Sequence, residues 1–177
     1  MNDNDSIVIP ETLDGKPVIA IGTYVNKEIW YSDNLDDMYW GALYGDIKIP
    51  DTVKYIGEYT DDSVSGFVVD ENNPYYASEN GSLYTKDMKT LLFYSGENGP
   101  HAKISEKAEV FAPSNGLFGA WAKTLELGKN IKTIDTQYYY DESEAYTKCP
   151  FSIKGYKGTS AEKWAKENKI EFIVLDW

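Results

Sequence analysis

The sequence predicts an α/β repeat solenoid, in which short parallel strands stack on one side and short helices or turns lie on the other. Two observations lead to this prediction. A short pattern of apolar residues recurs along the chain, and its clearest copies end their first strand at a proline or a glycine. One copy is too small to bury its own apolar side, so neighbouring copies must stack and share a core.

The repeated pattern is clearest in two segments. One begins with Ile-Lys-Ile at 47–49 and the other with Leu-Glu-Leu at 125–127. This alternation is typical of a strand with one buried face. Pro50 and Gly128 end the strands, because proline cannot donate to a sheet and glycine permits a sharp bend. Further apolar residues stand four and seven places after Ile49 and after Leu127. They are Val53, Ile56, Ile131 and Ile134.

Two further copies are recognisable. The same offsets lead from Ile104 to Ala108 and Phe111. The N-terminal copy begins with Ile-Val-Ile at 7–9 and inserts five residues, around 14–17, before it reaches Ile21. The step from Ile104 to Leu127 is 23 residues, within the range of about 20 to 29 expected of leucine-rich repeats.

Other steps are irregular, at 40 residues from Ile9 to Ile49 and 55 from Ile49 to Ile104, so the array is interrupted. We still expect the strand-ending apolar residues to lie on one buried ladder of parallel strands. They are Ile9, Ile49, Ile104, Leu127 and Ile153.

The segment Ile-Lys-Ile-Pro-Asp-Thr-Val-Lys-Tyr-Ile-Gly at 47–57 resembles the repeat of BspA-like leucine-rich-repeat proteins. In that family a helical Ala-Phe-x-x-Cys segment precedes the next strand, and Ala-Tyr-Thr-Lys-Cys at 145–149 is similar. The resemblance implies that Cys149 is a buried core residue, and as the chain's one cysteine it forms no intrachain disulfide. It also implies a right-handed solenoid, a secreted or cell-surface location in a bacterium, and a role in adhesion or recognition.

A hairpin insertion at about 67–94 also resembles this family. Asn80-Gly81 predicts a tight type I′ turn, and the strand at 90–94 is expected in the same small sheet. The remainder of 1–177 is interpreted as the same single domain.

The last segment, about 155–177, resembles the family's closing unit. Thr159 and Glu162 predict a capping box at the start of a helix. The helix is expected to bury Ala161, Trp164 and Ala165. The last strand is expected to bury Ile170, Phe172 and Val174.

Charge excludes several kinds of partner. The chain has 29 acidic residues against 17 basic ones, every one of them lysine, and residues 1–70 hold 14 acids against 4 lysines. A nucleic-acid binder needs a positive surface and favours arginine, and an anionic membrane surface also attracts positive charge. No run of eighteen apolar residues and no secretory signal are present. We expect a monomer that neither binds nucleic acid nor inserts in a membrane.

Motifs for catalysis are absent from the sequence. It has no phosphate-binding loop, no Gly-x-Ser-x-Gly and no Cys/His zinc spacing, and its one histidine, His101, is expected in a loop. We therefore expect no enzyme activity, no catalytic residue, no cofactor and no metal. A carboxylate-dependent hydrolase is a further alternative, resting on acidic clusters such as 33–37, 61–62 and 141–144. Solvated loop acids are the simpler interpretation, and 33–37 lacks the spacing of an EF-hand calcium loop.

Aromatic residues gather between the first two strands, interleaved with acids. Such rings are suited to a protein or host-surface ligand, or to sugar rings, because aromatic side chains dominate interface hot spots. The alternative is that they pack over the end of the solenoid. The sequence thus favours a non-enzymatic binding module for a protein partner, with a carbohydrate-binding module as the alternative. The candidate ligand-binding residues are Trp30, Tyr31, Tyr39, Trp40 and Tyr44.

Overall fold

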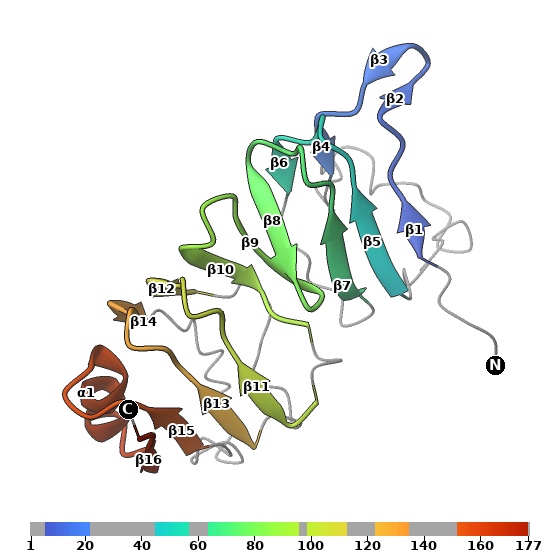
Figure 1. Cartoon of the computed structure of the whole chain (residues 1–177). Coiled ribbons are helices and arrows are strands. Elements are labelled where there is room, and N and C mark those ends of the chain that lie inside the picture. The colour runs from blue at the N-terminus through green and yellow to red at the C-terminus, as the bar shows by residue number, and fades with distance from the viewer. Residues whose placement is uncertain are drawn as a thin grey trace, which may run out of the picture.

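The computed structural model describes residues 6–21, 45–56, 64–95, 99–112, 123–134 and 152–176. Within them, short strands follow one another along an elongated body, from β1 near the N-terminus to β16 near the C-terminus (Figure 1). One helix is present among these residues, α1 (Ser160–Glu167). The fold is therefore strand-rich and repetitive.

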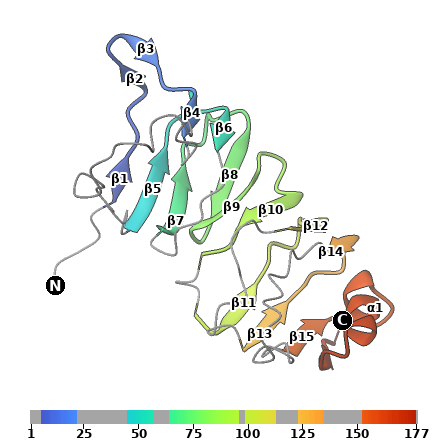
Figure 2. The ribbon, with the colours of Figure 1, turned by 180° about the vertical axis from the view of Figure 1, so that it is seen from behind.

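Two parallel ladders form one side of the body. The first has the order β1 (Ile7–Val8), β5 (Gly45–Ile49) and β7 (Val64–Val69). The second has the order β11 (His101–Lys103), β13 (Thr124–Glu126), β15 (Ser152–Gly155) and β16 (Phe172–Val174), and it ends beside α1 (Figure 2).

A second row of short strands faces these ladders across the core. β4 (Ala20–Ile21) pairs with β6 (Tyr55–Ile56), and β12 (Val110–Phe111) pairs with β14 (Thr133–Ile134), both in parallel. Helices or turns were expected on this side. The turns are present, but the apolar residues at the seventh place pair as strands. Their β-branched and aromatic side chains favour this pairing.

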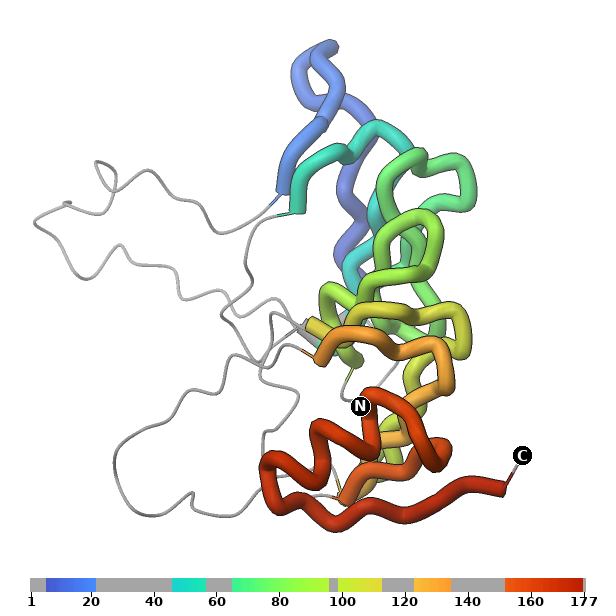
Figure 3. Tube along the Cα trace, turned by 90° about the vertical axis from the view of Figure 1, so that its left-hand side faces the viewer, coloured from blue at the N-terminus to red at the C-terminus, as the bar shows by residue number. Residues whose placement is uncertain are grey.

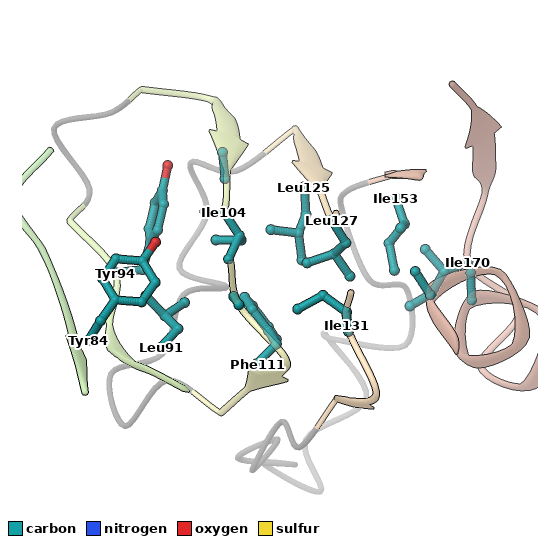
Figure 4. Packing of buried hydrophobic residues seen from close by; sticks show 14 residues of the cluster. Tyr84, Leu91, Tyr94, Ile104, Phe111, Leu125, Leu127, Ile131, Ile153 and Ile170 are labelled. Carbon is teal, nitrogen blue, oxygen red and sulfur yellow. The ribbon is translucent and has the colours of Figure 1, made fainter. Parts of the chain in front are cut away.

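The repeated offsets place the core as the sequence predicts. In three copies the fourth-place residue is buried, with exposed fractions of 0% for Val53, 0% for Ala108 and 2% for Ile131. In the N-terminal copy Leu13 is 65% exposed, because it lies in the inserted hairpin. Seventh-place residues lie in register, since Ile21 pairs with Ile56 and Phe111 with Ile134. Figure 4 shows Phe111 and Ile131 packed with Leu125 and Leu127 in the core. The prediction of a five-residue insertion in the first copy is also confirmed, because Ile21 occupies the place of Ile56.

The expectation of one continuous ladder is wrong. Ile49 belongs to the first sheet and Leu127 follows a strand of the second, and the two residues lie in separate buried clusters. The break occurs where the hairpin β8 (Tyr76–Glu79) and β9 (Ser82–Thr85) interrupts the stack.

The hairpin turn and the segment after β10 (Thr90–Phe93) contact β7 at this break. The N–H of Phe67 donates to the carbonyl of Gly81 at 2.7 Å. Ser95 donates its hydroxyl to the carbonyl of Ser65 at 2.6 Å and its N–H to Ser82 Oγ at 3.1 Å. A Cβ on Gly81 would lie 2.9 Å from Ser95 Oγ, so this close approach requires glycine.

The predicted type I′ turn is confirmed. Asn80 and Gly81 have φ angles of 51° and 73°, and Glu79 pairs with Ser82 across the turn. β10 pairs with β9, which confirms that the strand near 90–94 joins the same sheet. A second hairpin, β2 (Thr12–Leu13) and β3 (Lys16–Pro17), occupies the insertion of the first copy and projects from the body (Figure 3). The Asp-Gly dipeptide at its turn is the signal that indicates it.

The C-terminal unit differs from the prediction in several details. Thr159 makes no capping bond; its hydroxyl donates to the carbonyl of Tyr156 at 2.6 Å, and Glu162 accepts the N–H of Gly158 at 2.6 Å. The predicted capping box is therefore wrong, because the turn before the helix takes both groups. Ala161 and Ala165 are buried as expected, but Trp164 is only partly buried.

The last strand is also shorter than expected, because β16 begins at Phe172 and not at Ile170. Val174 belongs to β16 but is 54% exposed, so it does not join the core. Ile153 pairs with Leu125 and not with the place of Leu127. The buried Gly155 follows, where a Cβ would lie 3.2 Å from the ring of Phe172. The register of this copy is thus adapted to the closing helix and strand.

Candidate functional site

The predicted ligand-binding residues lie outside the described residues, and so do Cys149 and the acidic clusters. Their roles remain predictions. The residues concerned are Trp30, Tyr31, Tyr39, Trp40 and Tyr44 for the ligand, and 33–37, 61–62 and 141–144 for the acids.

A different candidate surface appears on the outer side of the first ladder. Val8 pairs with Lys48, and Lys48 pairs with Val68, so the three side chains form one row across three adjacent strands. Val8 is 64% exposed and Val68 is 44% exposed. We call these three residues the valine–lysine row.

The core behind this row fixes its strands. Ile47 and Phe67 alternate with Lys48 and Val68 and are each 1% exposed. The ring of Phe67 meets that of Phe93 edge to face, with centroids 4.9 Å apart and planes at 85°. The outer side chains are therefore held on a packed scaffold.

Lys48 has no salt bridge within the described part of the chain. Asp46, two residues before it on the same strand, lies instead against Gly66, where a Cβ would be 2.9 Å from Asp46 Oδ1. That oxygen is buried. Among the described residues, Asp46 therefore does not form an ion pair with the exposed Lys48.

The equivalent row of the second ladder is compensated internally. Lys103 pairs in register with Glu126, and their charged atoms are 2.9 Å apart. Glu126 is flanked on its other side by Lys154. On the second ladder the lysines are therefore next to a glutamate of the same chain, whereas Lys48 in the valine–lysine row is next to two valines.

A second charged ladder runs along the turns before the short strands. Glu109 lies between Lys89, at 3.0 Å, and Lys132, which it also contacts. Hydrogen bonds from Lys132 and then Lys89 hold the pKa of the Glu109 carboxyl below its ordinary value of 4.5. These two ion pairs connect the residues that directly precede β10, β12 and β14.

Glu109→Gln should therefore lower the melting temperature at pH 7. A carboxyl whose pKa is depressed by folding contributes stability above its unfolded pKa, and this is lost as pH falls through the folded pKa. The difference from the unmodified protein should vanish near roughly pH 2. Calorimetry at both pH values checks this, with Glu167→Gln as the control, since Glu167 is 3.8 Å from Lys163 and more exposed. An equal effect at both pH values would contradict the ion-pair explanation.

His101 lies in a strand, where a loop was expected. It begins β11 rather than lying in a loop, and its exposed ring Nδ1 is 2.9 Å from Thr124 Oγ1. Among the described residues, no group of three His, Cys, Asp or Glu side chains is arranged to hold a metal ion. Nor does the described part contain a helix of the length and apolarity that crossing a membrane requires.

The valine–lysine row was not predicted from the sequence, although the sequence contains a signal for it. Val8 and Val68 occupy outward places of strands whose alternation leads one to expect polar residues. Recognising the row requires the pairing of Val8 with Lys48, which are 40 residues apart.

Part of the chain is similar to two solved structures. One is the pneumococcal vaccine antigen PcpA, with 25% identity and a TM-score of 0.45; the match covers 51% of this chain and 24% of that one. The other is a leucine-rich repeat protein from Eubacterium ventriosum, with 21% identity and a TM-score of 0.39; the match covers 50% of this chain and 31% of that one. The match thus spans less than a third of either neighbour. No protein-family model and no curated protein matches the chain.

Proposed function

We propose that the chain is a leucine-rich-repeat recognition module of a secreted or cell-surface bacterial protein, of the BspA-like type, and that it binds a protein partner without catalysing a reaction. The observation that carries the proposal is the valine–lysine row. It places two exposed valines and a lysine, which has no salt bridge among the residues that the structure describes, in register on a rigid parallel sheet.

The chemistry of the row favours a protein surface. Fully burying a valine contributes on the order of 1.5 to 3 kcal/mol relative to leaving it exposed. Two valines that enter an interface together therefore supply a useful part of a binding free energy. Rigid strands reduce the entropy lost on binding, because the side chains are already in place.

Composition supports a role without catalysis. The chain has no arginine and one histidine. Histidine is the commonest general base, and a nucleophile needs such a base nearby. His101 contacts a threonine hydroxyl on the exposed surface.

The proposal is tested by probing arrays of purified extracellular proteins and of glycans with the full chain. Protein binding should be lost in the double variant Val8→Thr, Val68→Thr, which keeps the β-branched shape and removes apolar surface. A matched control, Ile173→Thr with Val174→Thr, changes exposed apolar residues at the other end, on β16, and should bind normally.

Two outcomes would overturn the proposal. One is protein binding that the Val8→Thr, Val68→Thr variant retains in full. The other is an array on which only glycans bind, with binding lost on Trp30→Ala and Trp40→Ala. That result would establish the carbohydrate-binding alternative.

A further inference from the structure

The spacing of the valine–lysine row restricts what can lie across it. Neighbouring strands are about 4.8 Å apart, so Val8 and Val68 are separated by about 10 Å with Lys48 midway. In an extended segment, side chains on one face recur every 6.8 Å or so, which matches neither interval well. On a helix, residues three or four apart are separated by roughly 4.5 to 6 Å along the axis, and residues seven apart by about 10.5 Å.

The charge of the row restricts the partner further. Lys48 lies between two apolar side chains and has no salt bridge among the residues the structure describes, whereas Lys103 of the second ladder is paired with Glu126 at 2.9 Å. A partner that covers the valines removes water from the Lys48 ammonium as well. Burying a charge without a counter-charge is costly, so the partner must bring a carboxylate to the centre of the contact.

Extending the proposed function, we infer that the row docks an amphipathic helix of a partner protein that has apolar residues at positions i and i+7 and Asp or Glu at i+3 or i+4. The helix lies across the three strands, with its apolar residues on Val8 and Val68 and its carboxylate on Lys48. The overall charge of −12 is spread over the chain, and repulsion from charges more than about 8 Å away is largely screened at physiological salt.

The test uses two synthetic peptides of about 18 residues, made helical by side-chain bridges because free helices of this length are marginal. One has Leu at i and i+7 with Glu at i+4, and the other has Lys in place of the Glu. Binding to the full chain is followed from the methyl NMR signals of Val8 and Val68. The Glu peptide should shift both valines and bind about tenfold more tightly than the Lys peptide.

Charge reversal provides the decisive variant. Lys48→Glu should reverse the preference, so that the Lys peptide binds about tenfold more tightly than the Glu peptide. Lys154→Glu makes the same change in the outer row of the second ladder and should leave the preference unaltered. Lys48 is exposed and Lys154 is half-buried, and the methyl spectrum verifies that both variants fold.

Three results would overturn the inference: no shift of the valine methyls, a preference that Lys48→Glu does not reverse, or equal binding of an unbridged, proline-containing Glu peptide. The array experiment separates this failure from that of the proposed function. If Val8→Thr, Val68→Thr abolishes array binding while the peptides fail, the recognition surface stands and the helical partner is wrong.

Discussion

Asn73→Ala should lower the free energy of unfolding by about 4 kcal/mol. Asn73 is fully buried at the fourth place after Val69, where Val53 lies in the preceding copy. Its Nδ2 donates to the carbonyls of Pro50 at 2.8 Å and Val53 at 3.0 Å. Its Oδ1 accepts the N–H groups of Tyr75 and Tyr76, as separate bonds of 2.8 and 2.9 Å.

The size of the effect follows from the four hydrogen bonds to backbone groups that alanine removes; of these groups, the Pro50 carbonyl still accepts the N–H of Val53 at 3.4 Å. A net contribution of about 1 kcal/mol per hydrogen bond gives the estimate, and desolvation of the orphaned groups raises rather than lowers it. Chemical denaturation measures the loss. The control is Asn72→Ala, because Asn72 is exposed and its side chain donates only to Asp70, at 3.2 Å.

Asn73→Val adds a sharper comparison. It restores the apolar residue that other copies have at this place, so a purely hydrophobic account predicts a gain in stability. The hydrogen-bond account predicts a loss that remains well above that of Asn72→Ala. A loss for Asn73→Ala within about 1 kcal/mol of the control would show that the bonds contribute little.

Phe111→Ala should also cost about 4 kcal/mol, for a different reason. Phe111 is 0% exposed and lies between Leu91 and Ile134 of the neighbouring short strands. Alanine removes the apolar contact of a whole ring and leaves a cavity that a packed repeat fills only partly. Guanidinium denaturation gives the value.

The matched control for Phe111→Ala is Tyr55→Ala. Tyr55 is also an aromatic residue of a short strand on this side of the fold, but it is 64% exposed. Its loss should stay below about 0.5 kcal/mol. Similar costs for the two variants would mean that the seventh-place residues do not build the core.

The sequence was informative wherever the signal is local. Offsets of four and seven from the strand predicted the burial of Val53, Ala108 and Phe111, because the same short turn recurs in each copy. The Asn80-Gly81 turn was equally predictable, since two consecutive positive φ angles select those residues.

The rest depended on contacts between distant residues. The two ladders separate where Gly81 approaches Ser95 and Phe67, and no local pattern reveals these contacts. Asn73 takes an apolar place because backbone groups of the preceding copy face it. The predicted aromatic site lies outside the described residues, and the valine–lysine row became visible only through the strand register.

The central claim is that distant segments stack in register as two separate ladders, and NOE contacts between labelled methyl groups test it most directly. Ile7 and Ile47 should show a contact, and so should Leu125 and Ile153, because each pair lies side by side on adjacent parallel strands. Ile49 and Leu127 should show none, since they belong to different buried clusters. Absence of the first two contacts, or a clear contact between Ile49 and Leu127, would contradict the account.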